Sequence, residues 1–219
     1  MPALLRKALA EFIGTGVFLT AIVGVNFANQ PTVLATAVLA TALGLMVLLT
    51  SDTSGGHLNP AVTLYFASKK AISWGTALTY MVAQILGGIL GGQLGGWIHG
   101  ASVYHVNNIS IQNGQFLSEV VATAGLVWLI GNLAARERGN IIPVVVALWV
   151  FSAANFTNSG ASANPAVTIA RMFVGGNPAV GVEQGLYWIL AEVVGVLVAV
   201  IGLTYVTPLG GKKKAKKKA

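Results

Sequence analysis

Long apolar segments alternate with short polar ones along the whole chain. The apolar segments cover residues 8–27, 32–50, 76–98, 116–134, 141–156 and 185–206. Most of them have about the 20 residues that a helix needs to cross a bilayer. Gly, Ser and Thr interrupt them, which membrane helices tolerate where neighbouring helices pack closely. The pattern predicts an all-α membrane protein with six transmembrane helices.

Polar markers recur in the two halves of the chain. Three such markers each occur once in the first half and once in the second, in the same order and 105 to 108 residues apart. They are Glu11 and Glu119, the segment NPAVT at Asn59 and at Asn164, and Gln84 and Glu192. Because each half holds three spans, the second half begins on the opposite side of the membrane, and the copies form an inverted 3+3 repeat.

This repeat indicates one channel domain over residues 1–210. Its two copies are expected at about 4–98 and about 115–207. Residues 211–219 form a basic C-terminal tail, KKKAKKKA preceded by glycine.

The repeated NPA triplets, Asn59, Pro60 and Ala61 and then Asn164, Pro165 and Ala166, predict the starts of two short helices. Asparagine is a preferred helix N-cap, and proline suits the first helical position. The helices expected over residues 59–68 and 164–173 are about 15 Å long, which is half the apolar thickness of a bilayer. In an inverted repeat they enter from opposite faces, and their N-termini meet near the bilayer centre.

Such a meeting point has the properties of a selective pore. Each helix N-terminus carries about half a positive elementary charge, and the asparagine amides can donate hydrogen bonds into the space between. The small residues before each triplet, in SGGHL and NSGASA, allow extended backbone whose carbonyls line a wet lumen. The sequence therefore predicts a passive channel that admits small neutral hydrogen-bonding solutes and disfavours cations and protons.

The distribution of charge argues for a membrane rather than for nucleic acid. The net charge is +7, and six of the thirteen basic residues lie in the tail; the others are Arg6, Lys7, Lys69, Lys70, Arg136, Arg138 and Arg171. With both termini in the cytoplasm, every basic residue except Arg171 lies on the cytoplasmic side. We expect a multi-pass protein of the plasma (inner) membrane. The tail is either a lipid-facing basic segment or a solvated end.

The segments AEFIGT (10–15), SGGHLNPAVT (54–63), AQILGG (83–88) and NPA (164–166) together resemble the aquaporin, or major intrinsic protein, family. The resemblance covers nearly the whole chain. It implies six spans plus two half-helices, one pore per protomer and usually a homotetramer. It also implies that His57, two residues before the first NPA, lines the inner pore and fixes its loop.

One position departs from the family pattern. Most aquaporins have an arginine directly after the second NPA, whereas this chain has Val167, and Arg171 follows one helical turn later. We expect the charge of Arg171 to face elsewhere, and the filter to be wider and more apolar. The segment NPAVTIAR resembles an unusual bacterial branch linked to uncharged metalloid acids. Glycerol and arsenous acid therefore stand beside water as candidate solutes.

The remaining filter positions are left as alternatives. Counting back three residues from Asn164 gives Ala161. The second span contributes Leu39 or Leu43, and the fifth contributes Trp149, Val150 or Phe151.

Carboxylates inside spans are costly and suggest a function. Glu11 and Glu119 are interpreted as supports that accept backbone N–H groups of the two loops, and the alternative is a proton relay in a coupled transporter. Glu192 is interpreted as a polar packing residue.

The sequence gives little evidence for an enzyme, a metal-binding protein or a scaffold protein. The chain has no cysteine and lacks any catalytic or metal-binding spacing, so neither an enzyme nor a metal or cofactor site is expected. His99 and His105 are assigned to the surface. A membrane scaffold protein would leave the doubled NPA unexplained. Gly87, Gly91 and Gly95 share one helix face, with Gly195 and Ala199 as counterparts, and predict close helix contacts.

Overall fold

A computed structural model describes residues 1–101 and 108–207 of the chain, and its secondary structure is helical. Within these residues six helices are long and apolar enough to cross a membrane: α1 (Ala3–Phe27), α2 (Thr32–Ser54), α4 (Trp74–Ile98), α5 (Gln115–Ala135), α6 (Ile142–Phe156, preceded by the 3₁₀ turn η1, Gly139–Ile141) and α8 (Val182–Tyr205). The six predicted spans are confirmed. The tail and His105 lie outside the described residues.

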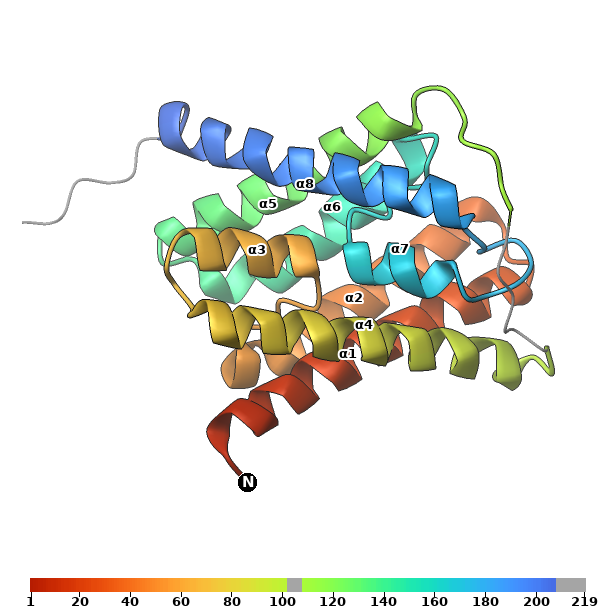
Figure 1. Ribbon diagram of the computed structural model, residues 1–219, viewed down its shortest axis with the longest axis horizontal. Coiled ribbons are helices and arrows are strands. Elements are labelled where there is room, and N and C mark those ends of the chain that lie inside the picture. Colours follow the sequence, from red (N-terminus) through yellow and green to blue (C-terminus); the bar gives the residue numbers. More distant parts are fainter. Residues whose placement is uncertain (102–107, 208–219) are drawn as a thin grey trace, which may run out of the picture.

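Two short helices lie between the long ones. Helices α3 (Pro60–Ser68) and α7 (Pro165–Arg171) point toward each other between α4 and α8 (Figure 1). Helix α7 ends two residues before the predicted end. Its last turn tightens, because the N–H groups of Met172 and Phe173 donate to carbonyls three residues earlier. The chain then folds back, and the Val180 N–H donates to the Arg171 carbonyl at 3.0 Å.

The two halves interlock rather than lying side by side. Helix α1 packs mainly on α4, and α5 packs mainly on α8, in the same pattern. Each short helix contacts the last helix of both halves, since α3 and α7 each pack on α4 and on α8. The half-helix tips therefore lie in the middle of a scaffold to which both halves contribute.

Glycines allow the long helices to approach closely. A Cβ atom at Gly87 or Gly91 of α4 would collide with the backbone carbonyls of Phe12 and Gly16 in α1. At Gly195 of α8 it would come within 2.9 Å of the Val120 carbonyl in α5. The predicted close helix contacts are confirmed.

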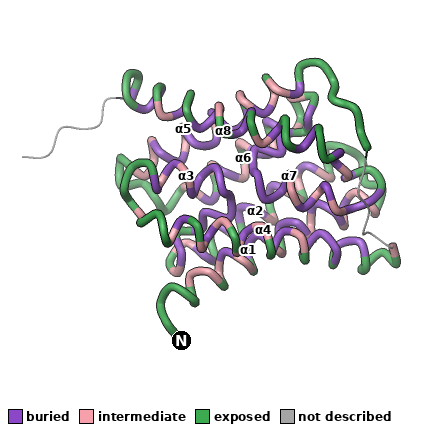
Figure 2. Tube along the Cα trace, in the orientation of Figure 1, coloured by how far each residue is buried: buried purple, intermediate pink, exposed green. Residues whose placement is uncertain are grey.

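The surface of the bundle is apolar along its length. Large hydrophobic side chains on the long helices point outward, among them Leu48, Leu78, Leu148, Leu190 and Leu197, each more than half exposed. Figure 2 shows that buried residues gather instead on the inner faces and on α3 and α7. An apolar exterior of this extent requires lipid, so the chain is a multi-pass integral membrane protein.

The start of α1 and the end of α8 both lie at the left-hand end of the bundle in Figure 1. Arg6 and Lys7 in the first turns of α1 lie there, as do Lys69 and Lys70 after α3. We call this the basic end. Helix α7 ends near the opposite end, which we call the outer end.

Candidate functional site

Asn59 and Asn164 cap the two short helices in the same way. Both have extended backbone, and each side-chain Oδ1 accepts the N–H group two residues later, from Ala61 at 2.8 Å and from Ala166 at 3.0 Å. Proline follows as the first helical residue in both cases. The sequence thus starts both helices by the predicted mechanism.

The same two side chains tie the helix tips together. Asn59 Nδ2 donates to the Ala163 carbonyl at 2.7 Å, and Asn164 Nδ2 donates to the Leu58 carbonyl at 2.9 Å. One N–H of each amide donates to the loop of the opposite half. The acceptor carbonyls belong to Leu58 and Ala163, whose left-handed backbone points each carbonyl toward the asparagine of the other half. Each amide has a second N–H group, and the expectation that the amides donate into the space between the tips concerns that group.

Glu11 supports the loop before α3. Its carboxylate accepts the backbone N–H groups of His57 at 3.0 Å and Leu58 at 2.6 Å. Gln84 Nε2 donates to the same carboxylate at 2.7 Å and to Thr63 Oγ1 at 3.0 Å. The side chain of Glu11 is fully buried.

Glu119 supports the loop before α7 in the same manner. Its two oxygens accept the N–H groups of Ser162 at 2.9 Å and Ala163 at 2.7 Å. Glu192 Oε1 accepts from the Asn164 N–H at 3.0 Å and from Thr168 Oγ1 at 2.8 Å. The interpretation of Glu192 as a mere packing residue was wrong, since it holds the loop directly. The sequence offered one indication of this role, because Glu192 occupies the repeat position of Gln84, which supports the loop before α3.

These contacts stabilise an unfavourable backbone. Leu58, Ala161 and Ala163 all have positive φ, from 46° to 51°. Outside glycine the left-handed region costs about 1–2 kcal/mol per residue. The buried carboxylates offset that cost by fixing the adjacent N–H groups, so the loops keep one conformation.

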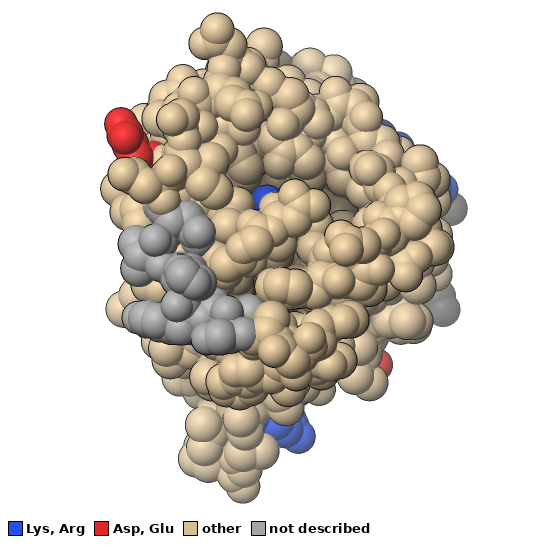
Figure 3. Space-filling model, turned by 90° about the vertical axis from the view of Figure 1, so that its right-hand side faces the viewer, with Lys and Arg blue, Asp and Glu red and all other residues tan. Residues whose placement is uncertain are grey.

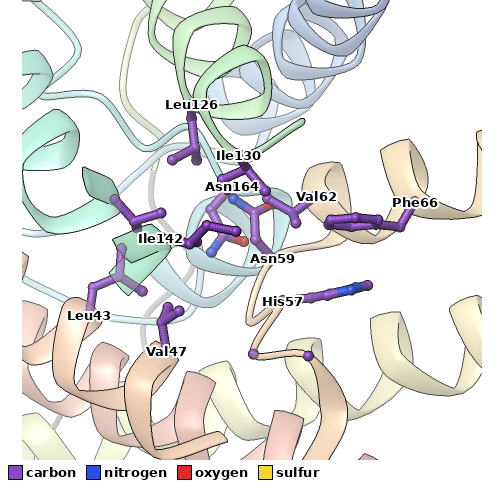
Figure 4. Close-up of a pocket in the computed structure, with 13 residues that line it drawn as sticks. Leu43, Val47, His57, Asn59, Val62, Phe66, Leu126, Ile130, Ile142 and Asn164 are labelled. Atoms are coloured by element: carbon purple, nitrogen blue, oxygen red, sulfur yellow. The ribbon is translucent and has the colours of Figure 1, made fainter. Parts of the chain in front are cut away.

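A narrow cavity of about 50 Å³ lies between the half-helix tips and the basic end. Figure 4 shows Asn59 and Asn164 side by side at this cavity, with His57 near Phe66. The His57 ring stacks on Phe66 at a centroid distance of 4.7 Å, and its Nδ1 lies 3.1 Å from Thr63 Oγ1. His57 is thus a fixed wall residue of this cavity.

A larger cavity of about 240 Å³ lies on the outer side of the tips. Asn59 and Asn164 line this cavity as well as the narrow one, so they lie where the two meet. Figure 3 faces the outer end and shows the surface hollowed at its centre.

The structure places the candidate filter residues relative to the outer cavity. Val167, Ala161, Val150, Leu39 and Leu43 all line the outer cavity. Trp149 does not, because its indole N–H donates to the Ala122 carbonyl of α5 at 2.8 Å. Phe151 lies in a shallow groove on the outside of α2 and α6. Both second-span candidates, Leu39 and Leu43, remain.

Arg171 lines the same outer cavity as Val167. The expectation that its charge faces elsewhere was wrong. Residues four apart in a helix share a face, so the spacing of Val167 and Arg171 could have predicted that both line the same cavity.

The remaining polar candidates lie apart from the cavities. Glu11, Glu119 and Glu192 face the loop backbones and line neither cavity, which favours loop support over a proton relay. His99 is exposed at the end of α4, as predicted. Among the described residues no group of His, Asp and Glu side chains has the arrangement of a metal site.

Known proteins are similar to this chain in sequence and in fold. The profile of the family "Major intrinsic protein" matches residues 1–158. The aquaglyceroporin AqpS of Rhizobium meliloti is 34% identical over 90% of this chain and 88% of its own length. Aquaporin TIP1-1 of Arabidopsis thaliana is 32% identical over 79% of this chain and 77% of its own.

A solved structure agrees in fold. The aquaglyceroporin of Plasmodium falciparum superposes with a TM-score of 0.74 at 21% identity, and the match covers 93% of this chain and 96% of that one. With the interlocked halves and the paired NPA tips, these matches establish that the chain belongs to the major intrinsic protein family, whose members are channels for water and small neutral solutes rather than enzymes.

Proposed function

We propose that the conduction path runs through both cavities and past the paired asparagines, and that it passes glycerol-sized neutral solutes as well as water. The observation that carries this proposal is that Asn59 and Asn164 line both cavities. A solute moving from one cavity to the other passes the two amides and the two helix N-termini. Their partial positive charges oppose cations and protons at this point.

The wall of the outer cavity supports the wider solute range. Val167, Ala161 and Val150 present only apolar side chains at the filter, and Leu39 and Leu43 complete it. An apolar wall accommodates the carbon face of glycerol, while backbone carbonyls and the asparagines serve its hydroxyls. The name of the relative AqpS, an aquaglyceroporin, is consistent with this range. Uncharged metalloid acids such as arsenous acid have similar size and hydrogen-bonding groups.

The extent of the domain, its orientation in the membrane and its oligomeric state can be proposed on the same grounds. We propose one channel domain over residues 1–210, with its basic end and both termini in the cytoplasm, in the plasma (inner) membrane. The six basic residues of the tail strengthen this orientation. The exposed apolar faces of α2 and α6 offer contact surfaces for a homotetramer with one pore per protomer.

Substitution of the filter valine tests the solute range. In Val167→Arg a long cationic side chain replaces a short apolar one, so glycerol flux should fall at least about tenfold more than water flux. The measurement is stopped-flow light scattering of proteoliposomes with water, glycerol and arsenous acid compared side by side.

Val167→Leu is the matched control, because it adds bulk without charge or donors. It should lower glycerol flux less than Val167→Arg does. Glycerol and water fluxes that are the same before and after the arginine substitution would refute the proposed filter.

A further inference from the structure

The outer cavity contains a single charged side chain among the described residues that line it, and this is Arg171. The narrow inner cavity has no Lys, Arg, Asp or Glu in its described lining. The view in Figure 3 shows a basic side chain deep in the hollow of the outer end. Among the described residues that line the two cavities, one formal positive charge is present, on the outer side.

The charge lies on the helix face that forms the path. Asn164, Val167 and Arg171 follow one another at spacings of three and four residues, and all three line the outer cavity. Four residues correspond to about 6 Å along a helix. The Cα atom of Arg171 thus lies about one helical turn farther toward the outer end than that of Val167.

The guanidinium is held in place on one side and free on the other. Its Nε donates to the Pro178 carbonyl at 2.7 Å, and its Cζ lies 5.6 Å from the ring centroid of Trp188. Trp188 is fixed in turn by the hydrogen bond of its Nε1 to Gln115 Oε1 at 3.4 Å. The terminal nitrogens make no hydrogen bond or ion pair with the described residues, so their four N–H donors remain available to water and solutes.

Two carboxylates lie near this cation, those of Glu119 and Glu192. Both accept hydrogen bonds from the loop before α7 and line neither cavity. The two carboxylates therefore lie behind the loop, whereas Arg171 lines the outer cavity. A cation in the outer cavity meets Arg171 directly.

We propose that Arg171 determines the charge selectivity of the channel by excluding cations at the outer entrance. This inference rests on the proposed conduction path. Arg171 lies one helical turn outside the filter, so the two residues have different roles. Val167 keeps the filter wide for neutral solutes, and Arg171 forms an electrostatic barrier to cations where the cavity is broad. The available N–H donors also orient solute oxygens toward the filter.

The test is potassium flux from KCl-loaded proteoliposomes, divided by the water flux of the same vesicles. Arg171→Gln should raise this ratio about tenfold, the Coulomb factor for a unit charge within roughly 12 Å at an effective dielectric constant near 20. Arg6→Gln, a matched change at the exposed basic end, should leave the ratio unchanged. A ratio that stays unchanged in Arg171→Gln overturns the inference.

Two further variants separate charge from structural support. Arg171→Lys keeps the charge but loses the planar group at Trp188, and it should retain most of the exclusion. The double variant Val167→Arg with Arg171→Gln moves the charge one turn inward and should restore exclusion. If Arg171→Lys leaks as much as Arg171→Gln, or the double variant leaks, the residue acts through packing and the inference fails.

Water flux distinguishes this failure from that of the proposed function. If vesicles with the unaltered protein show no water or glycerol flux above empty vesicles, the conduction path itself is wrong. If water passes and the potassium ratio does not respond to Arg171, only the role of Arg171 is wrong.

Discussion

Glu192 and Gln84 are matched residues of the repeat, yet one is a carboxylate and the other an amide. Glu192 uses only Oε1 in hydrogen bonds with the described residues, and its buried Oε2 has no partner there. Gln84 instead donates through Nε2 to the carboxylate of Glu11, and its own buried Oε1 has no partner among the described residues. At this pair of positions both halves therefore leave a buried oxygen without a donor, but a carboxylate oxygen costs more to leave unpaired than an amide oxygen. The unpaired oxygen destabilises the second half more than the first.

The contacts of the two carboxylates predict unequal effects of the same substitution, Glu to Gln, at Glu119 and at Glu192. Glu119→Gln should lower the free energy of unfolding by about 2 kcal/mol, because both oxygens of Glu119 accept loop N–H groups and an amide keeps only one acceptor. Glu192→Gln keeps the Oε1 acceptor and places a donor near Glu119, as Gln84 does near Glu11. It should therefore change stability by less than about 0.5 kcal/mol, or raise it.

Denaturant unfolding of the purified variants in detergent measures both effects. Equal losses for the two substitutions would show that the unpartnered oxygen of Glu192 contributes as much as the paired ones of Glu119.

At the scale of elements, the half-helices are too short to be stable alone. Helix α3 has 9 residues and α7 has 7, below the roughly 12 that an isolated helix needs. Their asparagine caps and N-terminal prolines start them, and packing on α4 and α8 holds them. The pore therefore depends on how closely the long helices approach one another.

The contact of α1 with α4 tests that dependence. Gly91→Ala places a Cβ against the Gly16 carbonyl in α1, which is backbone that cannot rotate away. We expect a loss of about 1–3 kcal/mol in stability and lower water flux, because the helices must separate. Circular dichroism during heating and stopped-flow scattering measure the two quantities.

Gly75→Ala in the same helix is the control. A Cβ there meets nothing nearer than Ser73 Oγ at 3.9 Å, and alanine favours helix, so stability should hold or rise by up to about 0.5 kcal/mol. A tolerated alanine at Gly91 would contradict the close contact.

At the scale of the whole molecule, neither half contains a complete path. The tip of each half-helix is capped by its own asparagine and joined to the loop of the other half. The lumen is formed only when the two inverted halves meet, and it is enclosed by a chain without cysteine.

That composition predicts resistance to mercury. Water flux through the unaltered channel should not change with mercuric chloride, because no thiolate is present to bind it. Val167→Cys introduces a thiol into the outer cavity and should make water flux sensitive to mercury, with recovery after a reducing thiol is added.

Leu197→Cys, at a lipid-facing position, is the matched control and should remain insensitive. The measurement is stopped-flow scattering before and after addition. An insensitive Val167→Cys would place Val167 outside the path.

The sequence by itself determined the elements. Six apolar lengths, two Asn-Pro starts and an odd number of spans per half follow from local rules: the cost of apolar surface in water, the capping of backbone N–H groups and the thickness of a bilayer. These rules act over a few residues, so the spans, the short helices and the inverted repeat could be predicted. The contacts of Glu11 and Glu119 with the loop N–H groups could be predicted as well.

Only the tertiary structure decided which groups meet. It joined Asn59 to the loop of Ala163 and brought Glu192 into contact with the Asn164 backbone. It also placed Val150, rather than Trp149 or Phe151, at the wall of the outer cavity. Such pairings join residues far apart in the chain, and they depend on the rotation and separation of packed helices by fractions of a turn. A hydrophobic pattern fixes which face of a helix is apolar, but in lipid both the outer and the inner faces are apolar, so the lumen becomes defined only when the helices pack.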